Sequence, residues 1–213
     1  MATVRRRSVA SRAASALAAA LTLLLVLTMT GTAEDEAASR PDVVLILLDD
    51  VDPHDGRLWS DPERTPTLAS LFSRSGVSFT SAVSETPLCS PGRAGLLTGR
   101  HTAAHGVDGN VAAAFDPRVT LGTELRAAGY HTILVGKYLN QLRTELRPRE
   151  LRRHARGWHE FEVIYEDNGR YYDYATWSRE GLERHGRKPS DHSTIVTRRK
   201  LVEHVRDAPT DRP

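Results

Sequence analysis

Cysteine, lysine and methionine are scarce in this chain. Its 213 residues include one cysteine, Cys89, two methionines and three lysines, Lys137, Lys188 and Lys200. A single cysteine excludes a disulfide scaffold within one chain. Because lysine is rare, arginine supplies nearly all of the positive charge. The sequence also lacks internal repeats, which excludes a repeat architecture.

The first 33 residues follow the pattern of a secretory signal peptide. Several arginines near the start precede an apolar run around residues 21–27, and small residues follow up to Ala33. This order predicts export with cleavage after Ala33. A membrane anchor is the alternative, but the apolar run is short and is interrupted by threonine. We expect a secreted or extracytoplasmic protein with no stable membrane span, a signal peptide over residues 1–33 and a short polar leader over residues 34–40.

The basic character of the chain belongs largely to this signal. The formal net charge is +2 and the sequence pI is about 8.8. Residues 1–33 hold four arginines and no acids, so their removal changes the net charge to −2. The charge therefore gives no argument for a nucleic-acid partner. A lone thiol in an exported protein has three explanations: intermolecular pairing, burial as a small apolar side chain, or chemistry.

Apolar patterning predicts alternating strands and helices after residue 40. The run Asp42–Leu48 and the run His131–Val135 are typical of strands buried on both faces of a parallel sheet. We expect an α/β sandwich with a largely parallel central sheet flanked by helices. Periodicity and capping residues predict a further strand over residues 77–83 and helices over residues 66–75, 89–99, 120–128 and 193–206.

Two later segments have a different composition. Residues 143–156 are rich in arginine and glutamate without a clear apolar stripe, which predicts a solvated helix or loop. Residues 158–174 are rich in aromatic side chains and are expected to pack over the sheet or its mouth.

Charged side chains follow two of the predicted strands at the point where each ends. Asp49 and Asp50 follow the first strand, and Lys137 follows the second. Ligands collect at the carboxyl ends of strands in open α/β sheets, so these side chains are expected to converge on one site. Adjacent carboxylates offer the oxygen ligands that Ca²⁺ and Mg²⁺ prefer. The acidic pair alone is weak evidence, because acids at strand ends also cap helices or meet water.

A more specific pattern begins at Cys89. Residues 89–93 (CSPGR) match the C-x-P-x-R core of the sulfatase signature, and residues 96–100 (LLTGR) resemble the tail that follows it. Residues 136–140 (GKYLN) and the aromatic pair at residues 171–172 resemble N-acetylglucosamine-6-sulfatases and related heparan-type glycan sulfatases. The chain thus resembles the formylglycine-dependent sulfatases of the alkaline-phosphatase-like superfamily. This resemblance implies that residues 41–213 are the N-terminal part of a sulfatase catalytic domain.

The resemblance implies a sulfuric ester hydrolase that acts on sulfated sugars or glycosaminoglycans. Cys89 would be oxidised to 3-oxoalanine (formylglycine) by a formylglycine-generating enzyme, which is an implied partner. A serine that attacked a sulfate ester would remain as a stable ester. A hydrated aldehyde carries two hydroxyls on one carbon, so that one attacks sulfur and the other then expels sulfate.

The resemblance also implies roles for individual residues. Asp49, Asp50 and the modified Cys89 would bind a divalent cation, Ca²⁺ or alternatively Mg²⁺. Arg93, four residues after Cys89, returns to the same helix face and would hold the formylglycine hydrate. Lys137 would bind the sulfate. Asn140 and, more weakly, His105 are candidates for substrate contact.

The sequence departs from the sulfatase pattern in two respects, and two alternative functions stay open. Gly92 replaces the usual serine before the motif arginine. The family's second pair of metal ligands is expected much further downstream, and Asp167-Asn168 comes too early to supply it. We therefore expect a fold incomplete on its C-terminal side that hydrolyses no sulfate ester usefully by itself. The alternatives are a phosphate or phosphonate ester hydrolase of the same superfamily and a non-catalytic, sulfated-glycan-binding remnant.

Overall fold

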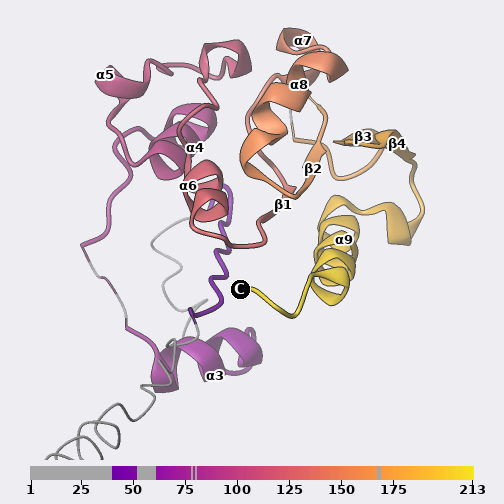
Figure 1. Ribbon diagram of the computed structural model, residues 1–213. Helices are drawn as coiled ribbons and strands as arrows, with labels where there is room; N and C mark the ends of the chain where they lie inside the picture. Colours follow the sequence, from indigo (N-terminus) through magenta and orange to yellow (C-terminus); the bar gives the residue numbers. More distant parts are fainter. Residues whose placement is uncertain (1–39, 52–60, 78, 80, 167–168) are drawn as a thin grey trace, which may run out of the picture. The chain divides into compact units, whose positions relative to one another are not determined.

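The computed structural model describes residues 40–51, 61–77, 79, 81–166 and 169–213, so the predicted signal peptide and Asp167-Asn168 lie outside the described residues. The chain divides into a unit that ends at Val43 and a second unit, Val44–Pro213, which holds every element named below. The elements follow one another along the chain as labelled in Figure 1: α3 (Pro66–Ser75), α4 (Cys89–Thr98), α5 (Thr102–His105), η2 (Ala112–Ala114), α6 (Leu121–Ala127), β1 (Ile133–Gly136), α7 (Leu142–Glu145), α8 (Pro148–His154), η3 (Ala155–Gly157), β2 (Glu160–Ile164), β3 (Tyr174–Ser178), β4 (Gly181–His185), η4 (Pro189–Asp191) and α9 (Ser193–Asp207).

The sheet is mixed, with the strands in the order β1-β2-β3-β4. Strands β1 and β2 are parallel, with Gly136 opposite Val163, and are joined by α7, α8 and η3. Strand β3 is antiparallel to both β2 and β4. The fold is therefore α/β as expected, but the expectation of a largely parallel sheet is wrong for the described strands. A hairpin, β3–β4, follows β2, and hairpins pair antiparallel strands.

Two predicted strands are also wrong. Residues 44–48 of the apolar run form no strand, and Val44 and Ile46 are 77% and 62% exposed. The described part of 77–83 has no strand either. A strand depends on its hydrogen-bonded neighbour as well as on its own composition, and no described strand pairs with either segment.

The predicted helices and the strand over residues 131–135 are confirmed to within a few residues. Helix α3 begins at Pro66 and ends before Gly76, and α6 has Thr120 as its N-cap. The Thr120 hydroxyl accepts the Thr123 N–H at 3.3 Å, and the Thr123 hydroxyl accepts the Thr120 N–H at 2.7 Å. These local bonds satisfy N–H groups at the start of the helix, which is why the sequence signal was reliable.

The arginine-rich segment is helical with all of its arginines exposed, as expected, but it also has a buried apolar face that was not expected. Leu146 and Leu151 in this segment, and Leu142 just before it, are between 0% and 6% exposed and join the main core. They pack with the aromatic residues that precede and follow them. The aromatic part of this core comprises Phe115, Tyr138, Trp158, Phe161, Tyr165 and Trp177. The sequence does not show this apolar face because the buried leucines lie in and between two short helices, α7 and α8. They form no continuous stripe at helical spacing.

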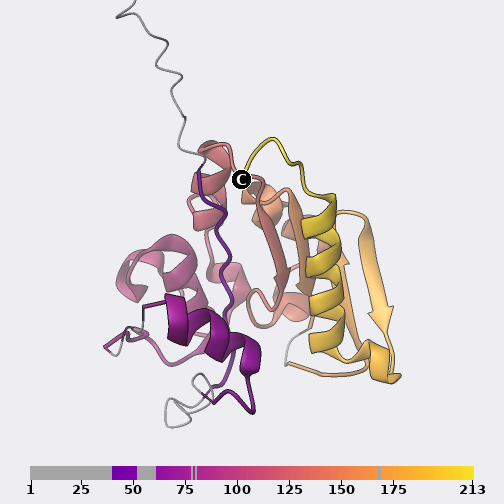
Figure 2. The same ribbon diagram turned by 90° about the horizontal axis from the view of Figure 1, so that it is seen from below.

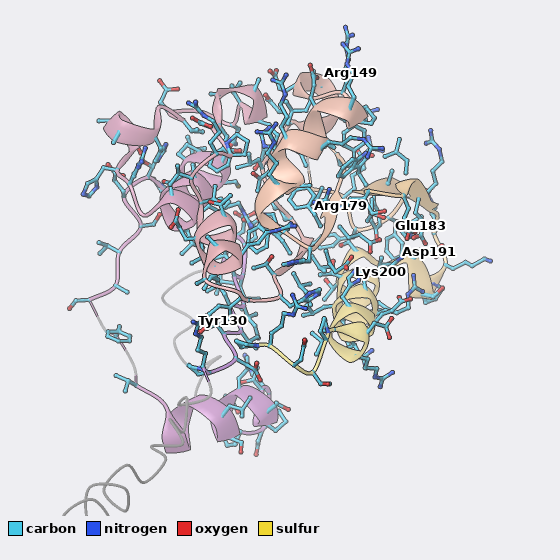
Figure 3. The ribbon with its side chains drawn as sticks, in the orientation of Figure 1. Tyr130, Arg149, Arg179, Glu183, Asp191 and Lys200 are labelled. Atoms are coloured by element: carbon cyan, nitrogen blue, oxygen red, sulfur yellow. The ribbon has the colours of Figure 1, made fainter. Side chains whose placement is uncertain are left out.

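Helix α9 is held against the sheet by buried charge pairs. Glu162 on β2 is 5% exposed, and its carboxylate accepts from Lys200 at 3.1 Å and from His204 at 3.1 Å. Lys200 also reaches Glu183 on β4 at 3.0 Å, and Figure 3 shows these two labelled side chains together. These contacts fix α9 beside the strands, as seen in Figure 2. Among the described residues, no helix is both long and apolar enough to cross a membrane.

Candidate active site

Helix α4 places Cys89 at its first position. The preceding residue, Leu88, is extended and gives no side-chain cap. The N–H of Ser90 is instead bonded by the Asn110 side-chain oxygen at 3.0 Å, from a loop twenty residues further along. The helix ends at Gly99, which adopts a left-handed conformation with φ 65°. Asn110 therefore caps the first turn of the helix that carries the candidate nucleophile.

The turn at Asp50 brings two neighbouring carboxylates to one side. In an extended chain, successive side chains point to opposite sides. Asp50 has a positive φ of 54°, a conformation that aspartate tolerates better than most residues and that interrupts this alternation. Carboxylate oxygens of Asp49 and Asp50 and the sulfur of Cys89 all lie within 4.8 Å of one another. The strand predicted before these acids is absent, yet the predicted convergence of the three residues is present.

Asp49 bridges two cationic side chains. Its Oδ1 accepts from Arg93 Nη2 at 3.1 Å, and its Oδ2 accepts from the Lys137 ammonium. The same ammonium lies 3.3 Å from the Cys89 sulfur. Arg93 is 9% exposed and also donates to the Lys137 carbonyl oxygen at 2.7 Å. Four sequence-predicted site residues are thereby brought together from three distant parts of the chain.

The charges in this cluster favour an ionised Asp49. Burial of the carboxyl group raises its pKa, but hydrogen bonds from Lys137 and Arg93 and the charges of both residues oppose that effect. The net result is a pKa of Asp49 below its ordinary value. Asp49 is thus available as an anionic ligand throughout the neutral range.

The donor set fits part of a hard-cation site. Asp49 and Asp50 supply carboxylate oxygens, and a hydroxyl would replace the Cys89 sulfur if this residue were converted to hydrated formylglycine. Ca²⁺ usually takes about six to eight oxygen ligands. Three protein residues are fewer than that, so the remaining ligands would have to come from substrate, water or further protein groups.

The turn after β1 is tied to the residue beside Cys89. The Asn140 N–H donates to the Ser90 hydroxyl at 2.9 Å, and Ser90 is fully buried. The Asn140 side-chain oxygen is buried and has no hydrogen-bond partner among the described residues. An acceptor of this kind costs about 1–3 kcal/mol unless a ligand or water supplies a donor. This geometry was not foreseen for Ser90 or Asn110, because nothing local in the sequence marks a loop that bonds twenty or fifty residues away.

Two other sequence observations have a structural counterpart. A Cβ added at Gly92 would lie 3.2 Å from both the Ser84 hydroxyl and the Thr86 carbonyl, so glycine suits the tight packing at this departure from the family motif. His105 accepts the Val107 N–H at 3.1 Å through Nδ1. Its Nε2 would lie 3.9 Å from a Cβ at Gly95 on α4. A substrate role for His105 remains a prediction.

A cavity of about 590 Å³ lies elsewhere, between β2–β4 and α9. Its lining includes the acids Glu160, Glu162 and Glu183 together with Lys200 and His204. Because acids outnumber permanent cations there, the cavity disfavours an anionic group such as sulfate. The cluster at Cys89 is the better candidate for sulfate chemistry.

The chain is similar to several curated sulfatases. It is 33% identical over 143 residues to the Extracellular sulfatase SULF-1 homolog of Drosophila melanogaster, an alignment that covers 64% of this chain and 12% of that protein. It is 32% identical over 170 residues to the human N-acetylglucosamine-6-sulfatase, covering 74% of this chain and 29% of that protein. The chain therefore spans less than a third of the length of these two relatives.

A solved structure shares the fold. It belongs to work on the metabolism of multiple glycosaminoglycans by Bacteroides thetaiotaomicron. The two chains have 24% sequence identity and a TM-score of 0.56, and the alignment covers 70% of this chain and 35% of that one. The sulfatase family model matches residues 41–208, a range that includes Asp49, Cys89 and Lys137. This match covers well over half of the sequence, and the chain belongs to the sulfatase family.

Proposed function

We propose that this chain carries the nucleophile and the sulfate-binding cations of a sulfuric ester hydrolase that acts on sulfated sugars. The observation that supports this most directly is the cluster in which Lys137 contacts both Asp49 and Cys89 while Arg93 contacts Asp49. A nucleophile precursor, two cations and two acids in one place are the parts that attack on an anionic ester needs.

The chain's own side chains have distinct tasks in this proposal. Lys137 donates to a sulfate oxygen and offsets the negative charge that builds up there. Arg93, nearly buried and fixed by two hydrogen bonds, holds Asp49 and the Lys137 turn in place. Asn140, whose side-chain oxygen has no hydrogen-bond partner among the described residues, is the candidate for contact with the sugar. Asp49 and Asp50 would hold a Ca²⁺ ion, which when bound polarises the sulfate and lowers the pKa of the attacking hydroxyl.

Formylglycine at position 89 supplies the covalent chemistry. In its hydrated form it would supply two hydroxyls on one carbon, one to attack sulfur as the S–O bond to the sugar breaks and the other to expel sulfate and restore the aldehyde. The sugar oxygen leaves with a proton. The partner required for this modification is a formylglycine-generating enzyme.

Binding is the test that does not depend on turnover. With Ca²⁺ present, calorimetry on the purified chain with glucosamine 6-sulfate compares wild type with Lys137→Met. Loss of a charged hydrogen bond worth about 1.5–3 kcal/mol predicts roughly 10- to 100-fold weaker binding. Arg118→Met is the matched control, because Arg118 also pairs with an aspartate, Asp116 at 2.7 Å, but is 77% exposed. It should bind within about twofold of wild type.

Two results would count against the proposal. Equal affinity of wild type and Lys137→Met would remove Lys137 from the sulfate site. Assays with aryl sulfate and aryl phosphate on chain produced with the generating enzyme address the reaction itself. Faster cleavage of the phosphate ester, dependent on Cys89, would favour the phosphate-hydrolase alternative.

A further inference from the structure

Three aromatic rings lie together on the surface beyond the ends of the strands. Tyr171 is 66% exposed and Tyr172 is 37% exposed. Tyr171 stacks on His192 with ring centroids 5.0 Å apart and 20° between the ring planes. Tyr172 meets the same imidazole edge-on at 5.2 Å. We call Tyr171, Tyr172 and His192 the aromatic platform.

Backbone hydrogen bonds anchor the two segments that carry the platform. The Ser193 N–H donates to the Tyr171 carbonyl at 2.9 Å, and the Asp173 N–H donates to the Gly186 carbonyl at 3.1 Å. Asp173 itself has a positive φ of 52° and pairs with Arg187. Exposed rings usually gain nothing by being fixed, whereas a fixed surface binds a ligand without losing further conformational freedom. The anchoring therefore favours a binding role.

The sheet topology puts the platform at the same edge as Lys137. Strands β1 and β2 are parallel, so Gly136 and Ile164 end at one edge. Strand β3 begins there and β4 ends there, because Tyr174 is opposite His185. Residues 169–173 lead into β3 and residues 186–192 follow β4, so both platform segments lie at this edge. It is the end toward which β1 and β2 run in Figure 2.

Helix α9 links the platform to the site at short range. A Cβ added at Gly136, the residue before Lys137, would lie 3.1 Å from Thr197 Cγ2. Thr197 is four residues, about 6 Å along the axis, from Ser193, which bonds to Tyr171. One turn of α9 therefore connects the strand end before Lys137 to the platform.

We propose that the aromatic platform binds the sugar residue next to the sulfated one, so that the substrate is an oligosaccharide rather than a single sugar. A pyranose ring presents a flat face of C–H groups that packs on an exposed ring such as Tyr171. Arg170 and Lys188, beside the platform in sequence and exposed, supply positive charge for an acidic neighbouring sugar. This inference depends on the sulfatase function proposed above.

The experiment compares two probes on the intact chain with Ca²⁺: glucosamine 6-sulfate and a heparin-derived tetrasaccharide. Tyr171→Ala should weaken binding of the tetrasaccharide about two- to tenfold, from an aromatic contact worth about 0.5–1.5 kcal/mol, and leave the monosaccharide unchanged. Tyr171→Phe keeps the ring and should bind both as wild type does. The control is Tyr130→Ala, the same substitution three residues before β1 at the opposite edge of the sheet, labelled in Figure 3.

Each other outcome has a separate meaning. Unchanged tetrasaccharide binding in Tyr171→Ala overturns the platform, as does an equal loss for both probes, which would indicate a general structural effect. If wild type binds the monosaccharide but gains nothing from the longer probe, the platform fails while the sulfatase proposal stands. If wild type binds neither probe, both proposals fail.

Discussion

His154 makes the stability of this protein depend on pH. It is 7% exposed and is packed between Phe115, at a centroid distance of 6.1 Å, and Tyr138, whose hydroxyl lies 3.2 Å from Nδ1. Burial lowers the pKa of His154 to about 4, and the charges of Asp116 and Glu150 only partly oppose this effect. Tyr138 is the neighbour of Lys137, so the buried imidazole supports the turn that carries Lys137.

The sign of the effect follows from comparing the two states. In the unfolded chain His154 has an ordinary pKa near 6.5, so below that pH the unfolded state binds a proton that the folded state does not. Stability from this group is therefore complete above pH 6.5 and falls as the pH drops toward 4. The shift from 6.5 to about 4 corresponds to about 3 kcal/mol at its limit and to about 2 kcal/mol by pH 5.

Urea unfolding at pH 7.5 and pH 5 measures this loss. Between these two pH values, wild type should lose about 2 kcal/mol more free energy of unfolding than His154→Gln, which cannot titrate. His101→Gln is the control, since the side chain of His101 is 87% exposed, and it should follow wild type. The reasoning is refuted if wild type and His154→Gln lose the same stability, or if NMR shows the folded His154 imidazole titrating near pH 6.5.

Three further predictions concern the fold that supports the site. Gly157→Ala places a Cβ 2.5 Å from the Thr123 backbone nitrogen and should lower the free energy of unfolding by about 1–3 kcal/mol. The control Gly109→Ala, whose nearest contact is at 4.0 Å, should change it by less than about 0.5 kcal/mol. Similar values for the two variants would contradict the close packing at Gly157. Asn110→Ala removes the cap on the Ser90 N–H and should cost about 1 kcal/mol, which Asn110→Asp should restore by supplying a carboxylate acceptor, as thermal unfolding can show. Leu151→Ala, at a fully buried position, should lower the free energy of unfolding in urea by about 2–5 kcal/mol. If Leu151 were solvated, the same substitution would lower it by less than about 0.5 kcal/mol.

Local signals predicted the helices well. Thr65-Pro66 and Gly76 bracket α3, and Thr120 caps α6, because these residues act on the backbone beside them. The strands were harder. The alternation that identifies a strand does not name its neighbour, so the run at residues 42–48 was assigned to a sheet that it does not join, and the hairpin of β3 and β4 was not foreseen.

The candidate site shows the same division. The motif around Cys89 pointed to Arg93 because one helical turn separates them, and Asp49 and Lys137 were expected at the same site because both follow apolar runs. The bonds that hold the cluster together were not predictable: Asn110 to Ser90 and Ser90 to Asn140 join loops far apart in sequence. Neither was the aromatic platform, since Tyr171 and His192 meet only when β4 returns to the edge where β2 ends.

The proposed role of Cys89 is that of precursor to the nucleophile. Its most direct test is mass spectrometry of the peptide that contains Cys89, from chain produced together with a formylglycine-generating enzyme and treated with a hydrazide that captures aldehydes. We expect an aldehyde at position 89 in wild type and no captured product from Cys89→Ala. An unmodified thiol at Cys89, in cells where a known sulfatase produced in parallel is converted, would contradict it.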